Sequence, residues 1–144
     1  MADIIFNRFK MGLLQGDYNL LEAGDDVKVM LTDSVYVPDA DLDLDVADGP
    51  RANEVSGTNY VADGFAITNQ AVTQDDTDNE GVFDGDDAVW ANSTITARHG
   101  VIYQDTAVDT TSLLIADLDF VSDQTTSNTE FKITWNAEGI VNLT

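Results

Sequence analysis

The sequence contains no cysteine and a single histidine, and its Lys and Arg residues are few. Without cysteine, neither a disulfide framework nor a thiolate metal site can form. Six Lys and Arg stand against 27 Asp and Glu, which gives a formal net charge of -21. A surface of this sign repels phosphate backbones and anionic membranes, so we expect neither nucleic acid nor membrane as a direct partner. The acidity itself is consistent with solubility, with cation binding or with a basic partner surface.

Long apolar runs are also absent. No stretch approaches the roughly 20 apolar residues that a membrane-spanning helix needs. Residues 1–14 lack the basic run and apolar stretch of a secretory signal, so we expect none. What is present is a chain of 144 residues, 43% of them hydrophobic, which is enough for one domain with its own core. We therefore expect residues 1–144 to form a single domain.

The first sixteen residues carry the one clear helical pattern. Apolar residues recur on a single stripe at Ile5, Phe6, Phe9 and Leu13. Asp3 is a suitable N-terminal cap for such a helix, and Gly16 is a natural stop. The pattern predicts a short N-terminal α-helical segment within residues 1–16.

From Val27 onward the apolar residues alternate with polar ones, which is typical of strands. Residues 27–32 predict a half-buried strand. Further strands are predicted at 65–67, 82–83, 88–90, 94–103, 114–120, 131–135 and 140–143. Asp-rich loops are predicted at 33–49, with a helical turn at 38–41, and at 75–87. Many short strands with frequent turns predict a mainly β fold over residues 17–144, either a β-sandwich or a jelly-roll-like barrel.

His99 is the only histidine available for nucleophilic catalysis. A Ser–His–Asp site would require it to meet a serine and an acid in space, and no nucleophile-elbow motif marks any serine. No phosphate-binding loop pattern is present either. We expect a strand-surface or interface histidine and no enzyme. The alternative is an enzyme that hydrolyses glycosides with two carboxylates. Only the distance between two such carboxylates in the folded protein can decide this alternative.

The second acidic segment resembles a calcium-binding loop in its spacing. Its acids fall at alternating ligand positions, with Gly81 at the sharp turn: Asp76, Asp78, Glu80, Asp84 and Asp87. Asp87 replaces the usual bidentate glutamate, and the flanking residues predict strands instead of helices. Two interpretations stay open, a Ca²⁺ site or a solvated acidic loop, and we expect no other cofactor.

Segments spread over nearly the whole chain occur in a distinctive order: 7–14, 27–32, 36–39, 53–58, 89–94, 101–103 and 135–140. Together they resemble a family of small virion structural proteins of tailed bacteriophages. The resemblance implies a virion component, assembled in the bacterial host cytoplasm, and most of all a capsid decoration (cement) protein. Such a protein binds the outside of the mature major capsid protein lattice, commonly as a homotrimer. The resemblance carries over no catalytic residues.

Alternatives to this role are a tail, head–tail connector or fibre-attachment protein, a calcium-stabilised binding module and, last, a glycan-active enzyme. For partner binding the candidate residues belong to the N-terminal stripe and its two basic neighbours: Ile5, Phe6, Arg8, Phe9, Lys10 and Leu13. This segment either docks on a neighbouring molecule or packs on its own domain. The usual behaviour of amphipathic helices favours self-packing.

Overall fold

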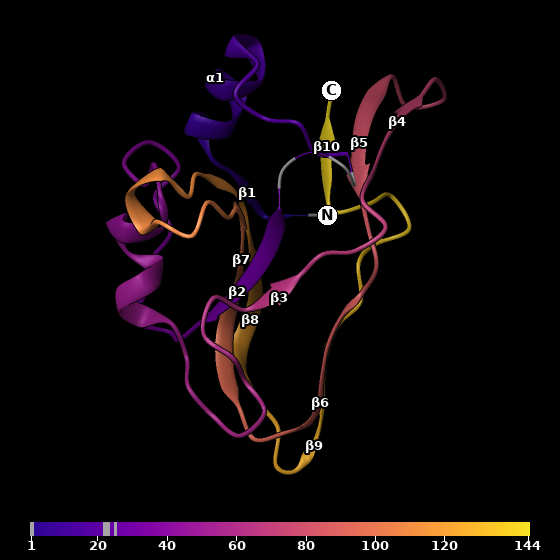
Figure 1. Cartoon of the computed structure of the whole chain (residues 1–144). Coiled ribbons are helices and arrows are strands. Elements are labelled where there is room, and N and C mark those ends of the chain that lie inside the picture. Colours follow the sequence, from indigo (N-terminus) through magenta and orange to yellow (C-terminus); the bar gives the residue numbers. More distant parts are fainter. Residues whose placement is uncertain (1, 22–23, 25) are drawn as a thin grey trace.

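The computed structural model describes residues 2–21, 24 and 26–144 (Figure 1). It is mainly β, as predicted, with one short α-helix near the N-terminus. The strands are β1 (Ile4–Ile5), β2 (Val27–Thr32), β3 (Phe65–Ala66), β4 (Ala71–Asp75), β5 (Glu80–Asp84), β6 (Ala88–Ser93), β7 (Thr96–Gln104), β8 (Leu114–Thr125), β9 (Thr129–Ile133) and β10 (Val141–Leu143). The helices are α1 (Asn7–Gln15) and three 3₁₀ turns, η1 (Val46–Asp48), η2 (Pro50–Asn53) and η3 (Asp109–Thr111).

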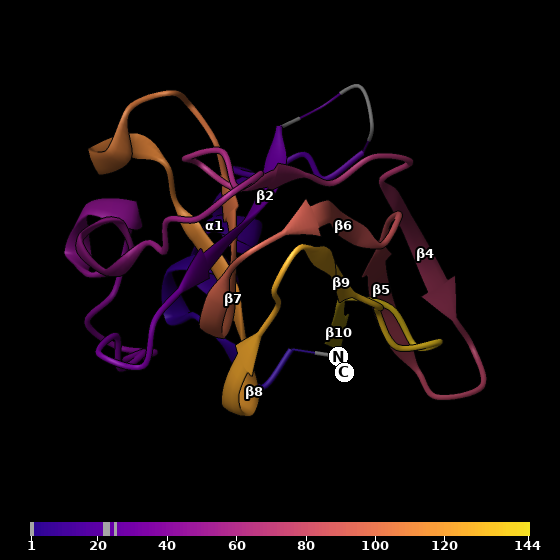
Figure 2. The same ribbon diagram turned by 90° about the horizontal axis from the view of Figure 1, so that it is seen from below.

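The strands of the described residues form three antiparallel sheets that make up two facing layers. The largest sheet has the order β1-β8-β7-β2-β3, and the smaller ones are β10-β5-β4 and β6-β9. In Figures 1 and 2 the two smaller sheets lie opposite the five-stranded sheet. The result is the β-sandwich-like single domain that the alternation of apolar and polar residues predicts.

The five-stranded sheet is buried on both faces. Val29 and Leu31 of β2 belong to the core between the two layers. Met30 of β2 points into a second apolar cluster, which Tyr36 and Val46 of the 33–53 segment cover from outside. The prediction of a half-buried β2 was therefore wrong, because a long loop folds over the face that alternation assigns to solvent.

The helical segment begins later than the sequence predicts. Ile4 and Ile5 form β1 and pair with β8, so α1 starts only at Asn7. Asp3 does not cap it; its carboxylate instead accepts a hydrogen bond from the Asp119 backbone N–H at 2.8 Å. In β1 the backbone groups of Ile4 and Ile5 pair with β8. In an additional first turn of α1, their N–H groups would have no partner within the helix. The predicted stop is confirmed, since Gly16 adopts the left-handed conformation at φ +78°.

The second acidic segment is a hairpin, not a loop. β4 and β5 pair in continuous register from Ala71 opposite Asp84 to Asp75 opposite Glu80, around a turn at 76–79. The Asp75 carboxylate accepts the Thr77 N–H at 2.7 Å, which closes this turn. The predicted strands at 82–83 and 88–90 are confirmed within β5 and β6. Acidic residues thus supply the turn, and the Val, Thr and Phe residues beside them supply the strands.

Candidate binding pocket

The six residues predicted for partner binding pack mostly on their own domain. Phe6 and Phe9 are buried at 0% and 1% exposure, Ile5 lies in β1, and Leu13 packs against the core. The two basic residues differ. Arg8 pairs with Asp17 at 2.8 Å, whereas the exposed Lys10 donates to Asn7 Oδ1 at 3.3 Å and forms no ion pair with the described residues. The apolar stripe therefore anchors α1 to the sandwich, and among these six side chains that of Lys10 is the exposed one.

The five residues predicted for calcium do not come together. Glu80 accepts a hydrogen bond from Asn142 at 2.5 Å, while Asp87 pairs with Lys132 at 2.8 Å. Because Glu80 and Asp84 lie on a paired strand, the twelve-residue ligand loop does not form. Within the described residues, the acids near enough to share an ion are instead Asp75, Asp78 and Glu138. Asp75 is partly buried and accepts the Thr77 N–H of the hairpin turn, whereas Asp78 and Glu138 are exposed.

The first acidic loop uses its aspartates as turn-formers. Asp39 accepts the Asp41 and Leu42 N–H groups, and Asp48 accepts those of Leu44 and Asp45. Each carboxylate therefore accepts hydrogen bonds from backbone N–H groups, which in a helix or strand would bond to a backbone carbonyl. This role explains why the acids are mostly Asp, whose short side chain reaches a nearby N–H.

His99 is buried in a pair with Asp117. Its Nδ1 atom lies 3.0 Å from Asp117 Oδ2, and the two residues are 7% and 1% exposed. Burial raises the pKa of Asp117 to about 6, although His99 opposes this by favouring the charged carboxylate. The expectation of a strand-surface or interface histidine was therefore wrong. The pair therefore presents little surface to a substrate in the folded protein.

Two further contacts enclose the buried pair. The ring of Tyr36 meets His99 edge-on, with centroids 6.0 Å apart, and its hydroxyl donates to Asp43 at 2.8 Å. Burial and the adjacent Asp43 raise the pKa of Tyr36 well above its ordinary range. On the outer side, Arg98 donates two hydrogen bonds to Asp119 and lowers the pKa of that carboxyl to about 2. The cluster ties the covering loop to the sheet.

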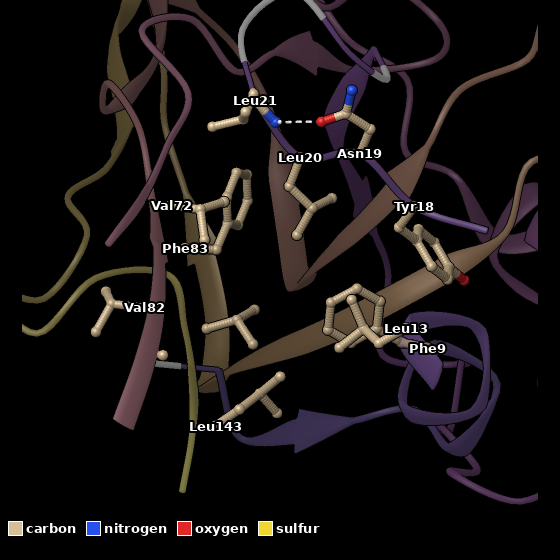
Figure 3. Close-up of a pocket in the computed structure, with 12 residues that line it drawn as sticks. Phe9, Leu13, Tyr18, Asn19, Leu20, Leu21, Val72, Val82, Phe83 and Leu143 are labelled. Carbon is tan, nitrogen blue, oxygen red and sulfur yellow. Dashed lines mark hydrogen bonds between the residues drawn. The ribbon is translucent and has the colours of Figure 1, made fainter. Parts of the chain in front are cut away.

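A hollow lies between α1, the 18–21 segment, the β4–β5 hairpin and β10. Its volume is about 480 Å³, within the range of ligand pockets. The walls are mainly apolar, with Phe9, Leu13, Leu20, Phe83, Val141 and Leu143 among them. Figure 3 shows the hairpin residues on one side and the α1 residues on the other.

Two half-exposed apolar residues also line the pocket. Leu21 is 51% exposed and Val72 of β4 is 50% exposed. Asn19 is the polar amide in the lining, and among the described residues no Asp, Glu, Lys, Arg or His belongs to it. For a protein with a net charge of -21, an uncharged apolar hollow of this size is the feature best suited to bind something.

Sequence reasoning missed the pocket because three distant segments build it. Residues 9–21, 72–83 and 141–143 each show an ordinary apolar pattern, and only their packing leaves a space. One local signal was present. Gly81 interrupts the strand that contains Val82 and Phe83, and glycine within a strand often marks the close approach of another group.

The comparisons with known proteins add no relationship: no family model matches the chain, and no curated protein or solved structure matches it. In the described part of the chain, no helix is long and apolar enough to cross a membrane.

Proposed function

We propose that this protein is a non-enzymatic structural protein of a bacteriophage virion, specifically a decoration protein that binds the outer surface of the capsid lattice and stabilises it. The observation that carries this proposal is the uncharged apolar pocket with its half-exposed residues Leu21 and Val72. A protein that stays soluble through its charge and exposes one such hollow is suited to association with another protein. The resemblance noted in the sequence supplies the virion setting.

The distribution of titratable groups supports a role without catalysis. The single histidine is buried with Asp117, and Arg51 is surrounded by carboxylates of Glu54, Asp63 and Asp109. These groups hold segments of the chain together. None of these groups lines the apolar pocket, and the described part of its lining holds no Asp, Glu, Lys, Arg or His that could act as an acid or a base.

The acidity supports assembly on a lattice instead of self-association in solution. Copies that each carry a formal charge of -21 repel one another at low salt. Weak single contacts become strong only when several copies are held together, as in the trimer that we propose for the bound state. Such a protein remains dispersed until an assembled shell presents its repeated sites.

The test uses capsids from phage that lack this gene, mixed with the purified protein. We expect saturable co-sedimentation with mature capsids at a fixed copy number, and greater resistance of those capsids to heat. Electron microscopy of the decorated particle then places the protein on the head. Protein found only at the tail or neck, or rings of about six or twelve copies, would identify a tail or connector component instead. The absence of binding to any virion part would reject the virion role altogether.

A further inference from the structure

The glycine at position 81 is not explained by the fold. Gly81 lies in β5, the central strand of its sheet, where glycine is a poor strand former. Its backbone does not adopt a left-handed conformation, and a Cβ atom placed there would meet no atom within 4 Å. Neither conformation nor packing therefore requires glycine. The residue lies two positions before Phe83, on the same strand face, and its missing side chain leaves space in the pocket wall.

Among the described residues, no strand pairs with the outer edge of β4, the strand beside it. β4 is the outermost strand in the order β10-β5-β4, and its residues are almost all exposed. Its edge carries no Lys, Pro or bulge, the devices that usually prevent another strand from pairing there. Val72 of this strand lines the pocket and pairs across the hairpin with Phe83. A strand that added to β4 would lie next to the apolar hollow.

The charge of the hairpin indicates the chemistry of its partner. Residues 71–84 include five acidic residues and no Lys or Arg: Asp75, Asp76, Asp78, Glu80 and Asp84. None of these five forms an ion pair with a basic residue in the described part of the chain. A second copy would oppose its own acidic hairpin to this one, which repulsion disfavours. A segment that carries Lys or Arg is complementary to it.

We propose that β4 and the adjacent pocket form a docking site for an extended, basic segment of a partner protein. The segment adds to the free edge of β4 as a strand, and its inward-facing apolar side chains cover Val72 and enter the space beside Gly81. Backbone hydrogen bonds supply affinity, and the pocket with the acidic turn supplies selectivity. The proposal rests on the proposed function insofar as that function assigns the pocket to protein binding.

Gly81→Val is the decisive variant. The Cβ atom of a valine at this position meets no atom within 4 Å, and valine is a better strand former than glycine. We expect this variant to keep or exceed the wild-type Tm while it loses binding. Such a combination separates an occluded site from a misfolded protein. Val72→Lys adds a charge on the edge strand, and Val61→Lys makes the same change at a position that is 73% exposed outside the pocket lining.

The probe is a displayed library of random peptides, selected on wild-type protein and counter-selected on Gly81→Val. We expect enriched peptides with alternating apolar residues and a Lys or Arg at one end. A synthetic copy of the leading peptide should bind wild type and Val61→Lys equally, and bind Gly81→Val and Val72→Lys at least about tenfold more weakly. N-methylation of its alternate amides should abolish binding, because the edge hydrogen bonds are lost.

Several results would overturn the proposal. No enrichment over the counter-selection, or enrichment of acidic or aperiodic peptides, removes the assigned partner chemistry. Unchanged binding of the N-methylated peptide makes the hollow a pocket for small apolar groups. A concentration-dependent dimer in sedimentation that Gly81→Val abolishes assigns the edge to a second copy.

Capsid binding separates this proposal from the function. If capsids bind wild type and Gly81→Val equally and no peptide discriminates between the two proteins, the decoration role stands and the docking site falls. If the peptides bind while capsids do not, the docking site stands and the decoration role falls.

Discussion

The aspartates of this protein act in two opposite ways, depending on where each one lies. Exposed ones such as Asp39 and Asp48 accept backbone N–H groups and form turns. Asp117 is instead buried beside His99, where loss of water raises its pKa to about 6 from an ordinary value of 3.8. A carboxyl with a raised pKa in the folded state binds its proton more tightly there than in the unfolded chain. Its contribution to stability is therefore largest at low pH and is lost as the pH rises through about 6.

This loss of stability with rising pH leads to a prediction for Asp117→Asn, a variant that removes the titrating carboxyl group. Relative to this variant, the wild-type protein should gain about 2 kcal/mol of unfolding free energy between about pH 7 and about pH 4.5. Urea unfolding of both proteins at the two pH values measures the difference, and the other carboxylates cancel in the comparison. Asp123→Asn, a change on the exposed part of β8, is the control and should show little pH dependence of its own. A wild-type-to-variant difference that stays constant with pH would contradict the raised pKa of Asp117.

At the scale of elements, sequence periodicity predicted the strands better than it predicted their surroundings. The alternation at 27–32 correctly gave β2, but it assigned Met30 to solvent, whereas Met30 is fully buried. Periodicity in one segment carries no information about a distant loop that folds over it. The acidic run at 75–87 predicted a loop for a similar reason. Asp and Asn mark the turn, but pairing with β10 on the far side of β5 stabilises the hairpin from outside that segment. The pocket needs the hairpin, β10 and α1 to be placed together, and these three lie far apart in the sequence.

The β1–α1 segment gives a prediction about how the N-terminus is held. Phe6 is 0% exposed in the second apolar cluster, and its N–H donates to Ile115 O at 3.1 Å. Phe6→Ala should lower the free energy of unfolding by about 3–5 kcal/mol, because it removes a buried ring and leaves a cavity. Leu14→Ala on the same segment is the control, since Leu14 is 93% exposed, and it should change stability by less than about 0.5 kcal/mol.

Denaturant unfolding monitored by tryptophan fluorescence measures both variants. Near-equal stability of Phe6→Ala and wild type would mean that β1 and α1 are not anchored to the sandwich. The candidate residues of the N-terminal stripe would then be available to a partner.

At the scale of the whole molecule, charge and fold act against each other. The compact domain brings 27 acidic residues together with only six basic ones to offset them. Ion pairs such as Arg8–Asp17 and Lys132–Asp87 are few and partly exposed, so each contributes little. Repulsion among the acids is spread over the whole surface, and the hairpin contributes five acids that form no ion pair in the described part of the chain. We therefore expect added salt to weaken the repulsion among the acidic residues more than it weakens the attraction within the ion pairs.

This balance predicts that salt stabilises the folded protein. Between about 0.01 M and about 0.1 M NaCl the Debye length falls from about 30 Å to about 10 Å, which is less than the width of the domain. The Tm should rise over this interval by a few degrees, corresponding to about 1 kcal/mol. Tetramethylammonium chloride should give the same rise, because screening depends on ionic strength and not on the identity of the cation. A double variant, Asp76→Asn with Asp78→Asn, should show a smaller slope. A Tm that falls with salt would mean that the ion pairs, and not the repulsion, dominate the electrostatics of this fold.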